Sequence, residues 1–223
     1  MISKEHRCIY IHIPKTAGTS IEKKLGHFET LKQNIQDHRT VAEIELLTDR
    51  KQHLKNSLYS LKLGKWNRAP LHARNALTPQ LTEKEFQEYY KFSFVRNSWS
   101  RMYSWYRNVL KDDFHRRKYN IVDPNYSFEE FIKTKVDPNR FSQLYYLTNK
   151  KGNVNMDFIG RFENLNADFK KVAGKLDLED SHLPKLLMWQ YNHYTEFYNA
   201  TTKDLVYKLF KDEIDYFNFE YGE

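Results

Sequence analysis

The sequence predicts an α/β fold, a three-layer sandwich in which a central, mainly parallel sheet is flanked by helices. Three short apolar segments, residues 9–13, 92–95 and 156–159, have the character of strands buried inside such a sheet. Segments with helical spacing lie between them, and strands that alternate with helices favour parallel pairing. No repeat, low-complexity segment or linker interrupts the chain, so we expect a single domain over residues 1–223.

The helices between and after these strands are predicted from capping residues and apolar spacing. Residues 81–90 open with Thr82 and Glu85 at capping-box spacing, and Ser127 and Glu130 open the next helix in the same way. The segment 98–110 has an apolar stripe on one helical face, which we interpret as core packing. The other helical segments are residues 41–63, as one or two helices, and residues 140–147, 164–176 and 202–217.

Cysteine content and hydrophobicity indicate a cytoplasmic protein. Cys8 is the only cysteine, which excludes an internal disulfide, and its place in the first strand predicts a buried apolar residue. Residues 1–7 lack the apolar run of a signal peptide, and no segment approaches the roughly 20 apolar residues that span a bilayer. We therefore expect no membrane span.

The net charge of +7 fits any polyanionic ligand and does not by itself identify one. Basic residues are scattered among acidic ones, and only residues 115–118 form a dense basic run, which is typical of a solvated helix end. We expect no nucleic-acid partner.

The segment after the first strand has the composition of a phosphate-binding loop that leads into a helix. A glycine allows close approach of the backbone to an anion, a lysine supplies charge, and hydroxyls can donate hydrogen bonds. The lysine precedes the glycine by three residues, unlike the standard Walker A pattern. Taken alone, the segment could equally be an ordinary capped turn. Its residues are Lys15, Thr16, Ala17, Gly18, Thr19 and Ser20.

A second candidate anion site follows the second strand. Arg96 stands at the carboxyl end of that strand, where α/β sheets bind ligands, and Ser104 lies in the following helix. Either residue alone would be read as a strand-end salt bridge or an ordinary helix serine. Together with the loop at Lys15, they predict a ligand that carries two separated phosphates.

These motifs resemble those of the sulfotransferases that use 3′-phosphoadenosine-5′-phosphosulfate (PAPS), in particular the carbohydrate-type, family 2-like branch with bacterial members. The Pro-Lys-Thr-Ala-Gly-Thr-Ser loop and the eight-residue spacing from Arg96 to Ser104 match, and residues 159–165 and 212–219 resemble two further family segments. The resemblance implies a P-loop-like fold, with the loop at the 5′-phosphosulfate and with Arg96 and Ser104 at the 3′-phosphate. It also places Arg161 among the cofactor-binding residues.

The resemblance further implies that Lys15 stabilises the leaving phosphate while a histidine deprotonates the acceptor hydroxyl. His38 is our first candidate because relatives carry a similar His-x-Thr-Ala segment, and Asp37 could orient its imidazole. His72 is the second candidate.

The implied enzyme is a PAPS-dependent sulfotransferase that releases 3′-phosphoadenosine 5′-phosphate (PAP) after in-line transfer to a hydroxyl. The sequence lacks common metal-binding motifs, so we expect no metal. The acceptor is open, with carbohydrates among the candidates, and so is the oligomeric state. The aromatic residues that could stack on an acceptor, or simply fill core and surface, are Trp66, Trp189, Tyr191 and Tyr194.

Two other function classes remain open from the residues. A nucleotide kinase-like P-loop phosphotransferase would share the first loop, although the sequence shows neither lysine next to the final glycine nor an evident Mg²⁺ carboxylate. A noncatalytic module that binds anionic glycans or nucleic acid would use the same positive charge.

Overall fold

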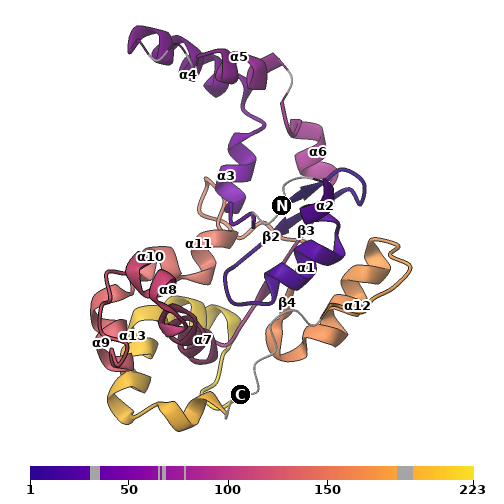
Figure 1. Ribbon diagram of the computed structural model, residues 1–223. Helices are drawn as coiled ribbons and strands as arrows, with labels where there is room; N and C mark the ends of the chain where they lie inside the picture. The colour runs from indigo at the N-terminus through magenta and orange to yellow at the C-terminus, as the bar shows by residue number, and fades with distance from the viewer. Residues whose placement is uncertain (31–35, 65, 67–68, 78, 185–192) are drawn as a thin grey trace.

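A computed structural model (Figure 1) describes residues 1–30, 36–64, 66, 69–77, 79–184 and 193–223. Its sheet has the strand order β1-β2-β3-β4. The strands are β1 (Ile2–Ser3), β2 (Cys8–Ile11), β3 (Tyr90–Val95) and β4 (Phe158–Arg161). β1 is antiparallel to β2, whereas the β2–β3 and β3–β4 pairs are parallel. The mainly parallel sheet is thus confirmed, with β1 as an addition at its edge.

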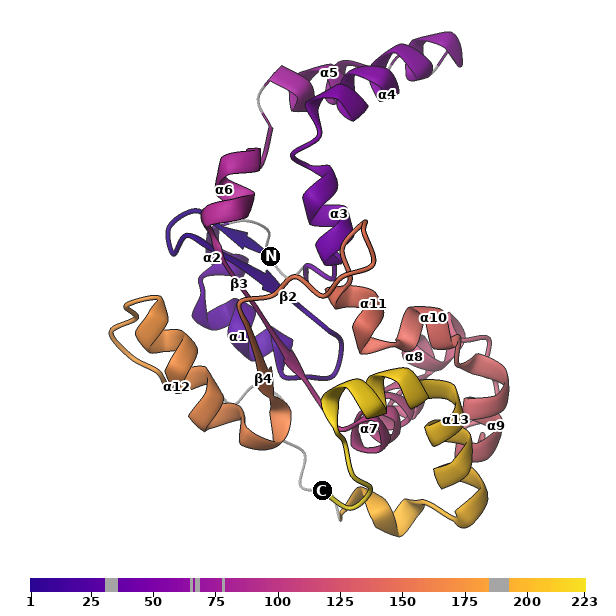
Figure 2. The same ribbon diagram turned by 180° about the vertical axis from the view of Figure 1, so that it is seen from behind.

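Alternate side chains of the strands face two different helical layers, which makes the fold a sandwich. Tyr10, Phe92 and Phe94 belong to one buried cluster, together with side chains of α1 (Gly18–Lys24) and α12 (Leu165–Lys175). Figures 1 and 2 show these two helices on the same side of the sheet. Cys8 is also buried in this layer, as predicted.

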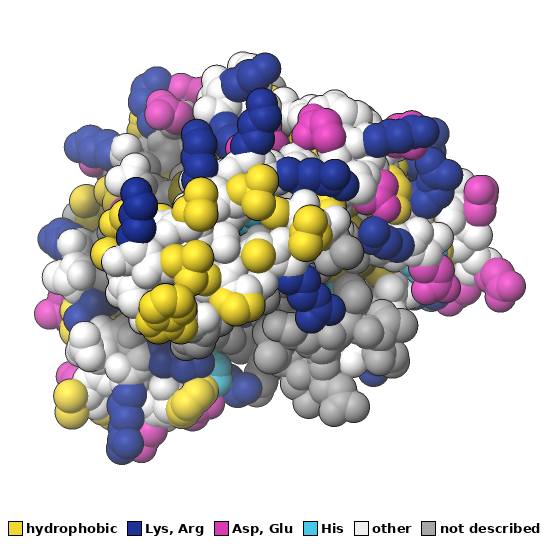
Figure 3. Space-filling view, turned by 90° about the horizontal axis from the view of Figure 1, so that it is seen from above, with side chains coloured by type: hydrophobic (Ala, Val, Ile, Leu, Met, Phe, Trp, Pro, Cys, Tyr) yellow, Lys and Arg dark blue, Asp and Glu magenta, His cyan; other side chains and the backbone are white. Residues whose placement is uncertain are grey.

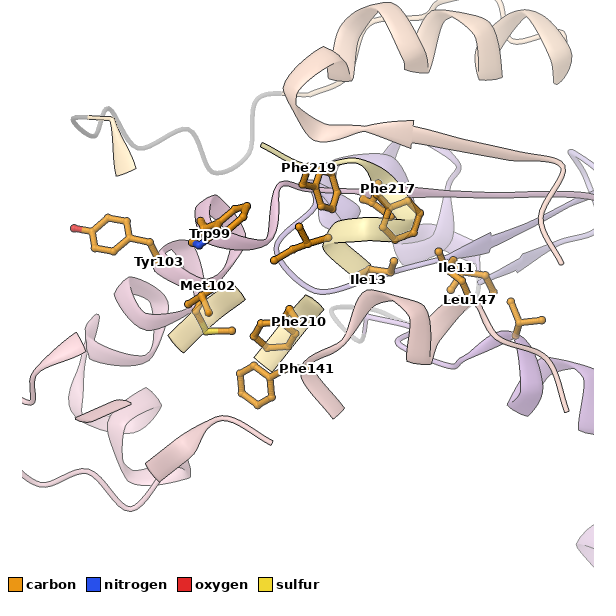
Figure 4. Close-up of a cluster of buried hydrophobic side chains, with 14 of the residues drawn as sticks. Ile11, Ile13, Trp99, Met102, Tyr103, Phe141, Leu147, Phe210, Phe217 and Phe219 are labelled. Carbon is orange, nitrogen blue, oxygen red and sulfur yellow. The ribbon is translucent and has the colours of Figure 1, made fainter. Parts of the chain in front are cut away.

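The opposite face carries the larger core, which Figure 4 shows in close-up. Ile9, Ile11 and Val95 point into it from the strands. From the predicted stripe of helix 98–110, Trp99 and Met102 are buried there, which confirms its assignment to the core. The helices that contribute are α3 (Val41–Leu46), α6 (Glu83–Glu88), α7 (Ser98–Leu110), α9 (Phe128–Lys135), α10 (Pro138–Phe141), α11 (Gln143–Leu147) and α13 (Ala200–Phe217).

The predicted caps form as the sequence indicated. Thr82 with Glu85 and Ser127 with Glu130 make reciprocal capping boxes at the starts of α6 and α9. The basic run 115–118 occupies the last turn of α8 (Asp113–Lys118), where cations suit the helix dipole. The remaining short elements are α2 (His27–Thr30), η1 (Phe162–Asn164) and η2 (Tyr194–Phe197).

A helical hairpin projects from the connection between β2 and β3. It consists of α4 (Arg50–Lys62) and α5 (Ala69–Leu77), and both views show it extending away from the sheet. The predicted helical segment 41–63 therefore divides into α3 and α4, while α5 was not predicted. Within the described residues, no helix is both long and apolar enough to cross a membrane.

Gly160 in β4 provides a test of how tightly the sheet packs. A Cβ at this position would lie 2.5 Å from Cε1 of Phe94, a fully buried ring. We expect Gly160→Ala to lower the free energy of unfolding by about 1–3 kcal/mol, because the core must shift to admit the methyl group. Urea denaturation measures this change.

Gly174 in α12 is the matched control, since a Cβ there would meet nothing within 4 Å. Gly174→Ala should leave stability unchanged or raise it by up to about 1 kcal/mol, because alanine favours helix. Equal effects of the two substitutions would contradict the packing described for Gly160.

Candidate functional site

The carboxyl ends of the three parallel strands bring the predicted site segments to one edge of the sheet. β2 leads into the loop that contains Lys15, β3 leads into Arg96, and β4 ends at Arg161. Parallel pairing sets Val95 opposite Arg161, so Arg96 is next to the end of β4. This edge is where open α/β sheets place their ligands.

The loop has a backbone shape that suits an anion. Lys15 and Ala17 have left-handed conformations, with φ of 73° and 67°, and Thr16 between them does not. Alternation of this kind turns successive N–H groups toward one concave side, as in anion-binding nests. The hydroxyl of buried Thr16 donates to the carbonyl of Ile13 at 2.8 Å, so Thr16 braces the loop and leaves only its main chain for a ligand.

Gly18 is required because a buried histidine lies directly against it. A Cβ on Gly18 would lie 1.8 Å from Cδ2 of His12. Nδ1 of His12 is 3.1 Å from a carboxylate oxygen of Glu22, another buried residue on α1. Burial lowers the pKa of His12 to about 4, against the opposing effect of Glu22, so the imidazole is neutral at neutral pH. His12 therefore acts as a spacer that fixes the start of α1.

The ammonium of Lys15 stands among other cations. Burial, and then the charges of Arg96 and Lys111, lower its pKa to about 8. Across the described residues, no ion pair or hydrogen bond holds this ammonium. A half-buried cation beside two others is destabilised by their charge, so an anionic ligand would stabilise it.

Arg96 ties the two predicted anion sites together. Its Nε donates to Oγ of Ser100 at 2.9 Å, and Nη1 donates to the carbonyl of Lys15 at 3.3 Å. The guanidinium also stacks over the ring of Phe162, 4.1 Å from its centroid. Burial lowers the pKa of Arg96 to about 10, with Glu163 opposing the shift, and the group stays charged at neutral pH.

Ser104 is on the helix face that Arg96 contacts. It is half-buried in α7, one turn beyond Ser100, and residues four apart share a helix face. The structure thus brings Arg96 into contact with the Lys15 loop and with the helix face on which Ser104 lies.

His38 lies beside the loop. Its Nδ1 is 3.1 Å from the carbonyl of His12, so Nδ1 carries the hydrogen of this bond. Its Nε2 is 3.0 Å from Oε1 of Gln36, and the rings of His38 and His12 are 4.2 Å apart. Gln36 also donates to Oγ1 of Thr19, which links this histidine to α1.

Asp37 does not orient His38 as the sequence suggested. Its carboxylate accepts hydrogen bonds from Arg39 and lies 3.3 Å from the amino group of Met1. The main chain of Asp37 instead donates to Glu22 at 3.0 Å, which anchors the segment next to α1.

Of two further site candidates, one lies beside Arg96 but its side chain has other partners, and the second lies on another element. The guanidinium of Arg161 pairs with Glu223 at 2.5 Å, donates to the carbonyl of Phe217 and stacks on Phe219, so it is engaged with the C-terminal segment. His72 belongs to α5 on the projecting hairpin, away from α1 in both ribbon views, and its side chain lies outside the described part of the structure.

Buried polar residues that the sequence did not single out hold Arg96 in place. The side-chain amide of Gln143 accepts from the N–H of Arg96 and donates to its carbonyl, both at 2.8 Å. Glu213 in turn accepts from the N–H of Gln143 and from the hydroxyl of Ser98. The one available signal was Glu213, an acidic residue within the apolar stripe of α13.

Arg101 holds the loop from the other side. It is fully buried, and its Nε donates to the carbonyl of Pro14 at 3.0 Å while Nη1 donates to Phe141 at 2.5 Å. Nothing in the local sequence distinguishes this arginine from those on the surface.

The candidate acceptor aromatics are dispersed. Trp66 is exposed on the projecting hairpin and Tyr194 is buried in the larger core. Trp189 and Tyr191 lie outside the described residues. Among the residues that the structure describes, no group of three or more His, Cys, Asp or Glu side chains could hold a metal ion.

Comparisons with known proteins identify the family of this chain. The profile of the sulfotransferase family matches residues 1–220. Carbohydrate sulfotransferase 14 of Danio rerio is 24% identical over 199 residues, which is 79% of this chain and 47% of that protein. An uncharacterized protein of Archaeoglobus fulgidus is 34% identical over 100 residues, 44% of this chain and 76% of the relative. No solved structure matches significantly.

The chain spans about half the length of the carbohydrate sulfotransferase that it matches. The family profile, in contrast, covers the loop at Lys15, the strand end at Arg96 and nearly all of the remaining sequence. This chain belongs to the sulfotransferase family.

Proposed function

We propose that this protein transfers a sulfuryl group from PAPS to a hydroxyl of an acceptor. The observation that carries the proposal is the joining of two cationic sites: Arg96 reaches across to the Lys15 loop, whose ammonium has no anionic partner in the described structure. Two linked sites at one sheet edge suit one ligand that bears two phosphates.

The residues of this edge fit such a donor. The left-handed turns at Lys15 and Ala17 and the close approach allowed by Gly18 suit the 5′-phosphosulfate. The guanidinium fork of Arg96, on the helix face of Ser104, suits the 3′-phosphate. Hydroxyls of Thr19 and Ser20 lie on the first turn of α1 and can donate hydrogen bonds to the 5′-phosphosulfate.

When bound, PAPS supplies the sulfuryl group and leaves as PAP. The ammonium of Lys15 then offsets the negative charge that develops on the departing phosphate oxygen. Nε2 of His38 takes the proton of the acceptor hydroxyl as its oxygen bonds to sulfur, and later releases that proton to water. For this step the Gln36 amide, whose Oε1 is 3.0 Å from Nε2, would have to move aside so that the lone pair of Nε2 faces the acceptor; Oε1 can then accept from the protonated imidazole.

The acceptor in this proposal is a carbohydrate hydroxyl. One support is the printed name of the Danio rerio relative, a carbohydrate sulfotransferase. Another is a groove of mixed polar and apolar lining between α3, α10, α11 and α13, whose lining includes Thr40, two residues after His38. Amide and hydroxyl groups of Asn139, Asn149 and Thr148 line it beside the ring of Tyr145, a mixture suited to sugar hydroxyls and ring faces.

Lys15→Ala and His38→Ala should separate donor binding from proton transfer. With PAPS and a panel of carbohydrates, we expect both variants to lose roughly 100-fold or more in transfer rate. Lys15→Ala should also bind PAP more weakly by isothermal titration calorimetry, whereas His38→Ala should bind it normally because His38 acts on the acceptor.

His182→Ala, which changes an exposed histidine, is the control and should keep wild-type activity. His72→Ala tests the other candidate base. If His38→Ala keeps full activity and His72→Ala loses it, the base is His72. If ATP stabilises the wild-type protein and PAP does not, the proposed donor is wrong.

Arg96→Lys should discriminate between ligands with and without a 3′-phosphate. Lysine keeps the charge but loses the fork that contacts Ser100 and the Lys15 carbonyl. We expect PAP affinity to fall by about 1.5–3 kcal/mol, the usual range for a lost charged hydrogen bond, with little change for AMP. Calorimetric titrations with both nucleotides measure this difference. Arg140→Lys, which changes an exposed arginine, is the control and should bind both nucleotides like the wild type. Equal losses of PAP and AMP affinity in Arg96→Lys would show that Arg96 does not contact the 3′-phosphate.

Donor binding should weaken at alkaline pH because the pKa of Lys15 is lowered to about 8 in the free protein. Above this value the ammonium loses its proton, so PAP affinity should fall by up to about tenfold per pH unit. A bound phosphate raises the pKa again, and binding near pH 8 should therefore take up a proton. Calorimetry in buffers of different ionisation enthalpy detects that uptake.

The affinity should be measured above about pH 7.5. There the phosphate groups of PAP, with a second pKa near 6, are already ionised, so their titration does not contribute to the pH dependence. Lys15→Met should abolish both the pH dependence and the proton uptake. A wild-type affinity that stays constant up to about pH 9.5 would contradict the role assigned to this lysine.

A further inference from the structure

The projecting hairpin has an inverted distribution of polar and apolar side chains. Ser57 and Ser60 of α4 are buried, and the Ser57 hydroxyl donates to the carbonyl of Ala69 in α5 at 2.8 Å. Leu54, Leu58 and Leu61 lie one turn apart on the outer face and are 51%, 62% and 39% exposed. A surface helix normally buries such a stripe and exposes its serines.

The apolar surface continues beyond this stripe. Tyr59 and Leu63 are exposed along α4 and just after it, while Trp66 is 71% and Leu77 is 78% exposed. Figure 3, which views the molecule from above, shows hydrophobic side chains gathered here with Lys and Arg side chains around them. An apolar cluster of this kind on a soluble surface marks a contact with another phase or molecule.

The charge on the hairpin is of one sign. Residues 50–77 contain seven Lys and Arg and no Asp or Glu, although the whole chain has 29 acidic residues. On α4, Lys51, Lys55 and Lys62 are exposed beside the leucines. The partner of this surface must therefore be apolar and negatively charged.

We propose that the α4–α5 hairpin docks on the surface of an anionic lipid bilayer. The leucine stripe and Trp66 would enter the boundary between headgroups and acyl chains, and the lysines would contact anionic headgroups. A second copy pairing through the same face would bring cations together without acidic partners. A bilayer accepts an exposed stripe of this kind without requiring the complementary groove that a protein partner must supply.

The position of the hairpin permits this contact. It extends away from the sheet in both ribbon views, so the body of the protein can remain in water while the hairpin lies on the membrane. The described residues of the Lys15 loop and Arg96 belong to that body, and docking does not require them to change.

Flotation with vesicles tests the proposal on the full chain. We expect it to float with vesicles of phosphatidylcholine that contain about 30% phosphatidylserine, to remain unbound with phosphatidylcholine alone, and to dissociate in about 0.5 M salt. Lys51→Gln/Lys55→Gln should lower the partition coefficient roughly 30-fold, about fivefold per cation. Leu54→Gln/Leu58→Gln/Leu61→Gln should lose binding by roughly 100-fold or more.

Matched controls change equally exposed residues elsewhere. Lys170→Gln/Lys175→Gln removes two cations from α12, and Phe114→Gln/Val122→Gln removes exposed apolar side chains around α8. Both should bind vesicles like the wild type. Circular dichroism verifies that every variant keeps the wild-type helix content.

Three outcomes would overturn the proposal. One is the absence of flotation with anionic vesicles at low salt, and another is an equal loss of binding in hairpin and control variants. The third is that the wild type does not bind vesicles but forms a dimer, or a complex with an acidic protein, and that the leucine variants lose this assembly. That result would assign the apolar face to a protein partner.

A further measurement locates the hairpin directly. Brominated lipids should quench the tryptophan fluorescence of the wild type, and the quenching should be smaller in Trp66→Phe.

Discussion

The site depends on the parallel pairing of β2 and β3. Their register sets Ile11 opposite Ser93, so the chain that leaves β2 and the chain that leaves β3 emerge side by side. The loop at Lys15 and the guanidinium of Arg96 can then touch, although they are 81 residues apart in sequence. A sheet of antiparallel neighbours would send these two segments to opposite edges.

Buried polar groups convert this proximity into a fixed geometry. The side-chain amide of Gln143 forms hydrogen bonds with both the N–H and the carbonyl of Arg96. Arg101 donates to the carbonyl of Pro14 at the start of the loop. Such groups are costly to bury unless they are paired, so each bond disfavours alternative positions of the loop and the arginine. The main chain of Arg96 and the start of the loop are therefore held in place, although the charged side chains of Lys15 and Arg96 repel one another.

The parts predicted from sequence are those with local signals. Strands, capping boxes and the stripe of α7 follow from short-range patterns, and the loop and Arg96 were found because they end strands. β1 has only two residues, too few for a pattern. His38 was proposed from family resemblance, because its segment has no periodicity that would single it out.

The contacts that support the site could not be predicted, because they join residues far apart in the chain. Gln143 is 47 residues from Arg96, and Arg101 is 87 residues from Pro14. A glutamine or arginine in a helix has no local feature that indicates such a partner. Glu213 alone interrupts an apolar stripe, and only the folded chain shows that it anchors Gln143.

His12 gives two functional elements a common support. Its ring lies against Gly18 at the start of α1, while its carbonyl accepts a hydrogen bond from Nδ1 of His38. A displacement of this one residue would shift the anion loop and the proposed base in concert. The spacing between the loop and His38 is thus set by one residue directly after β2, so the proposed anion loop and the proposed base share a single support.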